Sequence, residues 1–195
     1  MKKAEPLILT SFFFGIIMIA FHIVGYDIVF ILSTIILALI YFYLGIAIFN
    51  NIRFRRIFKK ESYKNLNLPL IINAILVGLA LSITLVGILF KYQMWANPNF
   101  IITMGLVGLI IISIISLLVY KGDFRKYLKK IFLRTILIGA IGILMLSVET
   151  KTILDWRYPN NPEYVKALLE SQKDPSNEDL WEKVQEERMK MQENE

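Results

Sequence analysis

The sequence predicts an all-α integral membrane protein, with five transmembrane helices arranged as two repeated hairpins plus one span and a short helical C-terminal tail. Three observations predict this class. The chain is 56% apolar, whereas a soluble globular chain is roughly 45–50% apolar. The apolar residues gather in five runs of about the 20 residues that a helix needs to cross the hydrocarbon core. The basic residues crowd into every second connection between these runs.

The five apolar runs are, in order, Leu7–Val24, Ile28–Phe49, Pro69–Phe90, Phe100–Tyr120 and Ile131–Val148. Helices are expected because lipid offers no partner to backbone amides, so the hydrogen bonds must close within each segment. The first run follows Met1-Lys2-Lys3 and begins like a signal peptide. It continues past signal-peptide length and no Ala-x-Ala site follows, so we expect an uncleaved first span.

The connections alternate between short and long. Gly25-Tyr26-Asp27 joins the first two spans and Lys91–Asn99 joins the third and fourth. Connections this short predict antiparallel helical hairpins. The hairpins are interpreted as repeats because Phe54–Lys60 recurs as Phe124–Lys130, with four of seven positions identical. Gly15 and Gly87 mark matching points in the two copies.

This parsing divides the chain into domains. The transmembrane domain is expected over residues 1–148, with hairpin repeats at about 7–60 and 77–130 and a fifth span over 131–148. Residues 149–195 form an acidic extramembrane tail.

The charges of the connections predict the orientation. The short connections hold only Asp27 and Lys91, whereas the long ones are strongly basic. The positive-inside rule then places the N-terminus on the cytoplasmic side of the membrane, with the short turns outside. Five crossings put the tail outside as well. The formal net charge of +6 thus reflects cytoplasmic connections and does not indicate a nucleic-acid partner.

Both basic segments have helical amphipathic spacing. Phe54, Ile57 and Phe58 share one face in the first copy, and Phe124, Tyr127 and Leu128 do so in the second. Their opposite faces carry Arg55, Arg56, Lys59, Lys60, Arg125, Lys126, Lys129 and Lys130. Basic amphipathic turns of this kind lie in the headgroup layer, where each cation gains about 1 kcal/mol from anionic lipid. We therefore expect these cations to contact membrane lipids; docking of a cytoplasmic partner is the alternative.

The tail carries signals for two short helices. Asn161-Pro162-Glu163 predicts the start of the first, while Asp174-Pro175-Ser176 ends it and begins the second, with Asp179 completing a loose capping box. Lys183 with Glu187 and Glu186 with Lys190 have supportive i, i+4 spacing. The apolar faces contain Tyr164, Val165, Leu168, Leu169, Leu180, Trp181 and Val184. Two helices with one apolar face each are expected to form no core of their own, and instead to dock on the membrane, the bundle or a periplasmic partner.

Small residues recur at helical spacing in three of the spans. They are Ala74, Gly78 and Ser82, then Gly105 and Gly108, then Thr135, Gly139 and Gly142. Such faces let helices approach closely in lipid. They predict packing seams, either within the chain or between protomers.

Ionisable groups at membrane depth are the default functional candidates. They are His22 near the outer end of the first span, Asp27 in the first turn, Lys91 closing the third span and Arg134 entering the fifth. The simplest interpretation is that Lys91 and Arg134 extend from helix ends toward the headgroups, and that His22 is an interfacial residue. No carboxylate lies centrally in a span, which disfavours a pump or an ion-coupled carrier.

The sequence contains no constellation for catalysis or metal binding. There is no nucleophile–base set, phosphate loop or metal-ligand spacing, and there is no cysteine. We expect neither an enzyme nor a bound cofactor.

The outer turns resemble the hairpin signature of the gliding-motility motor protein GldL of Bacteroidota. In the segment from Gly87 to Asn99 the family pattern is approximately G-x-L-F-K-x-x-H-W-P-G-A-[DN]. Phe90, Lys91, Trp95 and Asn99 match this pattern, whereas Met94 replaces His and Ala96-Asn97 replaces Pro-Gly. In the first hairpin His22, Gly25 and Asp27 match, with Ile23 in place of Trp and Ile19 in place of Lys. The likeness covers roughly residues 15–42 and 87–114.

The resemblance implies a bacterial inner membrane, with turns that face the periplasm and a candidate polar site there. The N-terminus would then be cytoplasmic and the C-terminal tail periplasmic. The residues of this site would be His22, Asp27, Lys91, Trp95 and Asn99. The family's second helix also carries a membrane-embedded glutamate implicated in use of the proton gradient. The corresponding positions here are about Leu37 and Leu109, so the resemblance implies a relative of the hairpin without the motor's proton pathway.

These observations favour a non-enzymatic inner-membrane scaffold or accessory subunit. It would associate with itself as a homo-oligomer or with another membrane protein, and it would present its tail to a periplasmic partner. A small transporter or channel component, with polar turns at one mouth, is the alternative.

Overall fold

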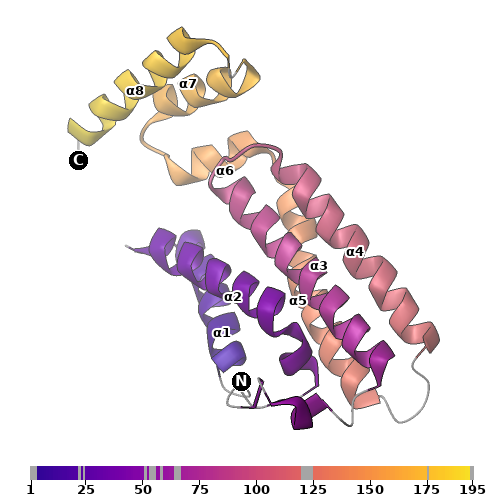
Figure 1. Ribbon diagram of the computed structural model, residues 1–195. Coiled ribbons are helices and arrows are strands. Elements are labelled where there is room, and N and C mark those ends of the chain that lie inside the picture. The colour runs from indigo at the N-terminus through magenta and orange to yellow at the C-terminus, as the bar shows by residue number, and fades with distance from the viewer. Residues whose placement is uncertain are drawn as a thin grey trace. The chain divides into compact units, whose positions relative to one another are not determined.

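The computed structural model describes residues 4–21, 23, 25–50, 52, 56–57, 59–63, 67–119, 125–174 and 176–193. The regular structure in these residues is entirely helical, as the sequence predicts. The chain forms two compact units, Met1–Leu146 and Ser147–Glu195 (Figure 1).

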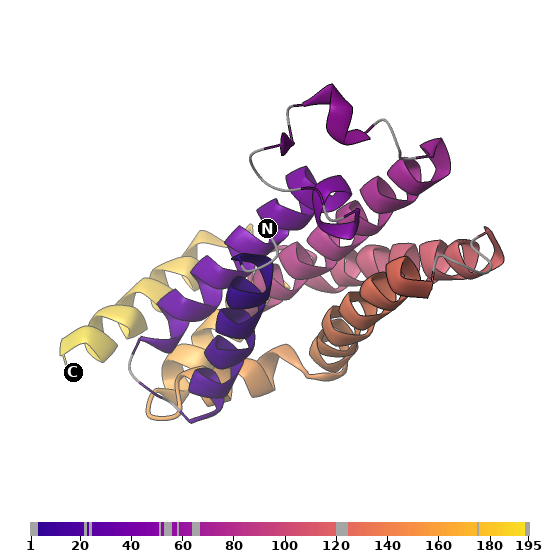
Figure 2. The same cartoon turned by 90° about the horizontal axis from the view of Figure 1, so that it is seen from below.

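The first unit is a bundle of apolar helices. Its helices are α1 (Ala4–Ala20), α2 (Tyr26–Phe49), α3 (Leu68–Tyr92), α4 (Pro98–Val119) and α5 (Arg125–Ser147), with a short 3₁₀ turn, η2 (Lys60–Tyr63). In this bundle α1 packs on α2, α2 on α3, and α3 on α4. Figures 1 and 2 show α2, α3 and α4 in this order. A core of large side chains, among them Phe12, Phe30, Tyr41, Leu81 and Ile138, joins the helices.

Four helices of the bundle are long and apolar enough to cross a membrane. These segments are Tyr26–Phe49, Leu68–Tyr92, Pro98–Leu118 and Tyr127–Ser147. The first helix is shorter, with an apolar part over Glu5–Ala20. The structure thus confirms a helical chain with several candidate membrane spans, and the count of five stays a prediction.

The two predicted hairpins share their helix boundaries. The first helix of each hairpin ends at Ala20 or Tyr92, and the second begins at Tyr26 or Pro98. Ala20 and Tyr92 are separated by the same number of residues as Tyr26 and Pro98.

A close helix contact recurs at the same spacing. A Cβ atom added to Gly15 would lie 2.9 Å from the Cα atom of Phe30, and one added to Gly87 would lie 2.7 Å from the backbone nitrogen of Ile102. In each hairpin a glycine lets the returning helix approach the first closely. The two glycines matched from the sequence therefore occupy equivalent packing positions.

The predicted small-residue seams include contacts within the chain. A Cβ atom on Gly78 would lie 2.5 Å from the carbonyl oxygen of Tyr41, where α3 crosses α2. One on Gly105 would lie 2.7 Å from the backbone nitrogen of Thr84, between α4 and α3. One on Gly142 of α5 would lie 3.0 Å from Cγ2 of Thr84. These glycines serve packing inside the bundle.

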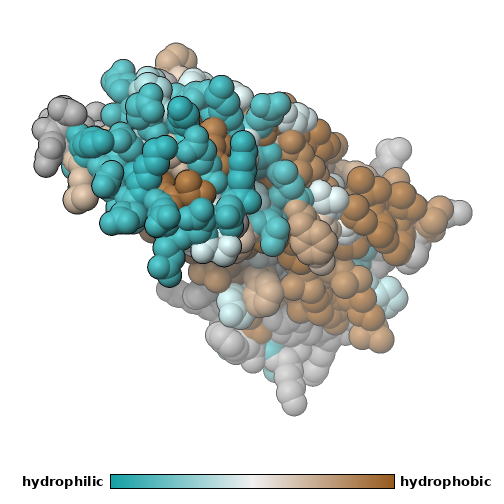
Figure 3. Space-filling model, turned by 90° about the horizontal axis from the view of Figure 1, so that it is seen from above, coloured by the Kyte–Doolittle hydropathy of each residue, from teal (hydrophilic) through white to brown (hydrophobic). Residues whose placement is uncertain are grey.

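The second unit contains α6 (Thr150–Arg157), α7 (Pro162–Lys173) and α8 (Glu178–Glu193). The expectation that the tail helices form no core is wrong, because α7 and α8 pack together around Tyr164, Ala167 and Val184. Antiparallel pairing lets the two apolar faces cover each other. The C-terminal helices facing the viewer in Figure 3 present a mostly hydrophilic surface.

Local contacts in the tail differ from the predicted ones. The backbone N–H of Asp179 donates to Oδ1 of Asn177 at 3.1 Å, so Asn177 caps α8 in place of the predicted Ser176. The Ser176 hydroxyl instead donates to Oδ1 of Asp174 at 2.7 Å. Residue Asn177 thus lies one position closer to the first turn of α8.

The ion pairs of the tail differ in part from the expected ones. Lys183 binds Glu170 across the hairpin at 3.2 Å, in place of the expected Glu187 on its own helix. Lys190 binds Glu187 at 2.6 Å with i, i+3 spacing, and the expected partner Glu186 also interacts electrostatically with Lys190. The first pair therefore links α7 to α8, a contact that spacing within one helix could not indicate.

Candidate functional site

Two predicted outer-turn residues meet where α3 ends and α4 begins. The Lys91 ammonium donates to Oδ1 of Asn99 at 3.0 Å and to the carbonyl oxygen of Leu146 at 3.5 Å. Lys91 is only 2% exposed. It therefore does not extend toward the headgroups, which corrects the interpretation of Lys91 as a residue that reaches out from a helix end. Its contacts join α3, α4 and α5.

The first hairpin contributes Asp27 to the same end of the bundle. The Tyr92 hydroxyl, next in sequence to Lys91, donates to Oδ1 of Asp27. The Tyr92 ring packs edge-on against Phe30, with ring centroids 4.7 Å apart. Asp27 lies near the start of α2 and Asn99 near the start of α4. They contact Tyr92 and Lys91, which are adjacent residues of α3.

The other two outer-turn candidates are not drawn into this cluster by the described contacts. Trp95 is 52% exposed, and its ring lies edge-on to Phe90 with centroids 4.8 Å apart. His22 lies outside the described residues.

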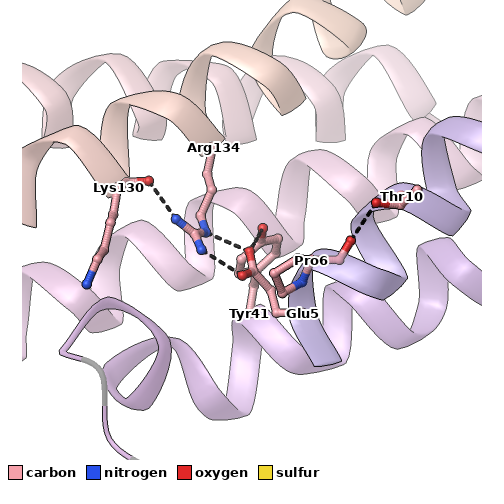
Figure 4. A network of polar contacts seen from close by, with 6 residues as sticks. All are labelled: Glu5, Pro6, Thr10, Tyr41, Lys130 and Arg134. Atoms are coloured by element: carbon pink, nitrogen blue, oxygen red, sulfur yellow. Dashed lines mark hydrogen bonds and ion pairs between the residues drawn. The ribbon is translucent and has the colours of Figure 1, made fainter. Parts of the chain in front are cut away.

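A second polar cluster was not predicted (Figure 4). Arg134 of α5 donates from Nε to Oε1 of Glu5 and from Nη2 to Oε2, both at 2.6 Å. The Tyr41 hydroxyl of α2 donates to the same Oε1 at 2.9 Å. Arg134 also donates from Nη1 to the carbonyl oxygen of Lys130 at 2.9 Å and lies over the ring of Phe49. This network joins α1, α2 and α5.

The cluster lies inside the bundle. The side chains of Arg134 and Glu5 are 14% and 5% exposed, so Arg134 does not reach outward as its place near a helix end suggested. Tyr41 precedes the last residue of α2, Phe49, by two helical turns, or about 12 Å at 1.5 Å per residue. The Glu5 carboxylate therefore lies inside the bundle, well before the end of α2, although no carboxylate is found in the middle of an apolar run.

Glu5 was missed because it precedes the first apolar run and lies 129 residues from its partner. The available signal was weak. Glu5 is an acidic residue that follows Lys2 and Lys3 directly before an apolar run, and Arg134 is a cation inside another run. Nothing local indicates that the two meet.

A third polar cluster joins α3, α4 and α5. Asn73 donates from Nδ2 to Oγ of Ser116 at 2.6 Å. Tyr127 donates to Oδ1 of Asn73 at 3.1 Å and lies 3.2 Å from the carbonyl oxygen of Leu70. All three side chains that form this cluster are buried.

The predicted lipid-contact cations are placed only in part. Arg56, Lys59 and Lys129 are exposed, and Lys130 is half-buried. Arg55 and the side chains of Lys60, Arg125 and Lys126 lie outside the described residues. The second basic segment begins α5 itself, and its Tyr127 packs into the bundle instead of facing the headgroups. The interaction with lipid headgroups stays a prediction.

The described residues contain no group of three or more His, Cys, Asp or Glu side chains that could hold a metal ion. Comparisons with protein-family models, with curated proteins and with solved structures find no match to this chain. A function for this chain must therefore be inferred from its own contacts.

Proposed function

We propose that this chain is a non-enzymatic scaffold or accessory subunit of a membrane complex, which presents a helical hairpin outside the membrane. The observation that carries the proposal is that buried polar groups of the bundle bind polar groups on other helices. Glu5 binds Arg134, Asn73 binds Ser116, and Lys91 binds Asn99. Each contact joins different helices, so these groups hold the bundle together and leave it suited to an anchoring role.

The C-terminal unit has the properties of a recognition element. Residues 149–195 contain 12 acidic and 7 basic residues. The helices α7 and α8 have a small core of their own. Trp181 is 40% and Met189 56% exposed, and exposed aromatic residues are frequent anchors in protein interfaces. We therefore assign contact with a periplasmic partner to the α7–α8 hairpin. A second copy of the chain or another membrane protein is the partner at the bundle.

The proposed topology has five spans, with α1 as a short first crossing. The N-terminus is then cytoplasmic and the C-terminal unit periplasmic, in accordance with the positive-inside rule. The recurring glycine contacts at Gly15 and Gly87 support two related hairpins, and the residues of their turns are the basis for assigning them to the GldL type. Leu37 and Leu109, at the positions of that family's glutamate, are 0% and 2% exposed. The proposed relative therefore lacks the motor's proton pathway.

Affinity purification tests the scaffold. The full chain and a chain ending before Asn161 are solubilised in mild detergent, and co-purifying proteins are identified by mass spectrometry. We expect the truncated chain to keep its membrane insertion and to lose the tail partner. Trp181→Ala should weaken that contact by roughly 1–4 kcal/mol, whereas Trp156→Ala, at a 52% exposed position of α6, should leave it unchanged. Retention of every partner by the truncated chain would contradict the proposal.

A transporter or channel component is the second candidate, and the Glu5–Arg134 pair is the observation that favours it. Carboxylates and cations within membrane bundles often mark ion pathways. The purified protein in liposomes would then show a conductance that Glu5→Gln or Lys91→Gln abolishes. The scaffold instead predicts no conductance, and associations that persist when the proton gradient is collapsed.

A further inference from the structure

The α2 and α3 helices leave a groove on one side of their crossing. They approach closely at Gly45 and Gly78, where a Cβ atom on Gly45 would lie 3.0 Å from the carbonyl oxygen of Ala74. The groove encloses about 340 Å³ and is lined by residues that precede Gly45 on α2 and follow Gly78 on α3. Since the helices are antiparallel, both sets lie on the same side of the crossing.

The walls of this groove are uncharged. Ala38 and Ser82, which are 5% and 6% exposed, are small lining residues. Leu39, Phe42 and Tyr43 are 51%, 51% and 71% exposed and line it from α2. Both helices are candidate spans, so these side chains face hydrocarbon in the proposed topology, on which this inference rests. A void here would leave its lining atoms without dispersion contacts.

We propose that the groove binds one acyl chain of an anionic phospholipid from the leaflet on the side where α2 ends. A groove of about 340 Å³ is too small to hold a helix from another protein, because a helix with its side chains is about 10–12 Å wide. The volume of the groove lies at the lower end of the roughly 300–1,000 Å³ typical of small-molecule sites. The groove is thus sized for a thin apolar chain.

The headgroup preference follows from charge complementarity. Tyr43 lies six residues before the end of α2 at Phe49, or about 9 Å at 1.5 Å per residue. The chain that continues beyond α2 carries exposed Arg56 and Lys59. Cations beside the membrane surface attract anionic headgroups. A lipid whose headgroup lies at this level can therefore extend an acyl chain past Tyr43 into the groove.

Native mass spectrometry of the detergent-solubilised protein tests the site with phosphatidylglycerol as the probe. We expect wild-type protein to retain one molecule per chain with saturation. Ala38→Leu fills the groove and should reduce retention about tenfold, because a packed interior has no room for both groups. Ala140→Leu adds the same atoms at an exposed position of α5 and should retain lipid as wild type does. Equal retention by both variants would overturn the proposal.

Two further arms identify the ligand. Arg56→Gln with Lys59→Gln should remove the preference for phosphatidylglycerol over phosphatidylcholine while one lipid is still retained; an unchanged preference would overturn the headgroup assignment. If a free fatty acid displaces phosphatidylglycerol at equal concentration, the ligand is a fatty acid and the phospholipid assignment is wrong. If Leu39 cross-links to a second copy of the chain, the groove is occupied by protein and the lipid proposal is wrong.

Fluorescence quenching provides a readout that does not depend on Ala38→Leu folding. Phe42→Trp places a reporter at the groove, and Ile114→Trp places one on α4 at a position that is 53% exposed. Phosphatidylglycerol brominated on its acyl chains should quench the added fluorescence of Phe42→Trp with saturation near one lipid per chain. The Ile114→Trp signal should fall only in proportion to lipid added. The same dose dependence in both variants would show ordinary surrounding lipid and refute the site.

Discussion

Glu5 and Arg134 show what single residues contribute to this bundle. The pair is bidentate and buried, and the Tyr41 hydroxyl supplies a further hydrogen bond to the carboxylate. A buried ion pair contributes less than its Coulomb energy suggests, because both ions lose their hydration. Loss of one partner is nevertheless costly, since the other remains as an uncompensated buried charge.

Glu5→Ala is therefore expected to lower the free energy of unfolding by about 3–5 kcal/mol. Lys183→Ala, which breaks an exposed pair with side chains 49% and 36% exposed, should lower it by at most about 1 kcal/mol. Thermal unfolding of the solubilised protein, followed by circular dichroism, checks both values. The combined Glu5→Met and Arg134→Met variant should recover most of the loss. Equal effects of Glu5→Ala and Lys183→Ala would contradict a structural role for the buried pair.

Residue-scale contacts also explain how the charged candidates were misplaced. Arg134 and Lys91 lie near the ends of apolar runs, where long cationic side chains usually extend to the headgroups. Both instead find acceptors on other helices, at Glu5 and Asn99. A partner on another helix cannot be identified from the charge pattern of one segment.

At the scale of helices, close approach depends on whether backbone or a side-chain tip occupies the space beside a glycine. A Cβ atom on Gly78 would meet the carbonyl oxygen of Tyr41 at 2.5 Å, whereas one on Gly139 would meet only Cδ2 of Leu106 at 3.8 Å. The first contact requires a shift of α2 against α3. The second is an ordinary van der Waals contact.

Gly78→Ala should thus destabilise the bundle by about 1–3 kcal/mol. Gly139→Ala should be neutral or slightly stabilising, because alanine favours helix by roughly 1 kcal/mol over glycine. The unfolding temperatures of the two variants in one detergent provide the comparison. A larger loss at Gly139 than at Gly78 would refute the close crossing of α2 and α3.

The start of α8 offers a second comparison between neighbouring residues. Asn177→Ala removes the side chain that accepts the Asp179 N–H, and loss of such a cap costs about 1 kcal/mol. Ser176→Ala leaves this cap in place and should have a smaller effect. Hydrogen exchange of the first-turn amides of α8 would measure both effects. Faster exchange in Ser176→Ala than in Asn177→Ala would show that Ser176 caps α8, as the sequence predicted.

The arrangement of the whole molecule is tested by its topology. A reporter active only in the periplasm should be silent after Lys60 or Lys130 and active after Glu195. A fusion at the N-terminus should be silent if α1 crosses the membrane, because the first span would begin in the cytoplasm. Activity at the N-terminus would reduce the count to four spans, and silence at Glu195 would overturn the orientation of the C-terminal unit.

The sequence by itself determined the helical class, the positions of the candidate spans and the change in character at the tail. Runs of apolar residues, Pro and Gly signals and small-residue spacing act over a few turns, so a single segment is sufficient to indicate them. The start of α7 at Pro162 and the equivalent positions of Gly15 and Gly87 were accessible in this way.

Only the tertiary structure decided which polar groups meet. Glu5 with Arg134, Asn73 with Ser116 and Asp27 with Tyr92 are far apart in the chain. It also decided that α7 and α8 cover each other, and that the α2–α3 crossing leaves a groove. The physical reason is that apolar periodicity indicates which face of a helix is buried but not its partner helix, whereas each of these contacts requires two particular faces to meet in one register.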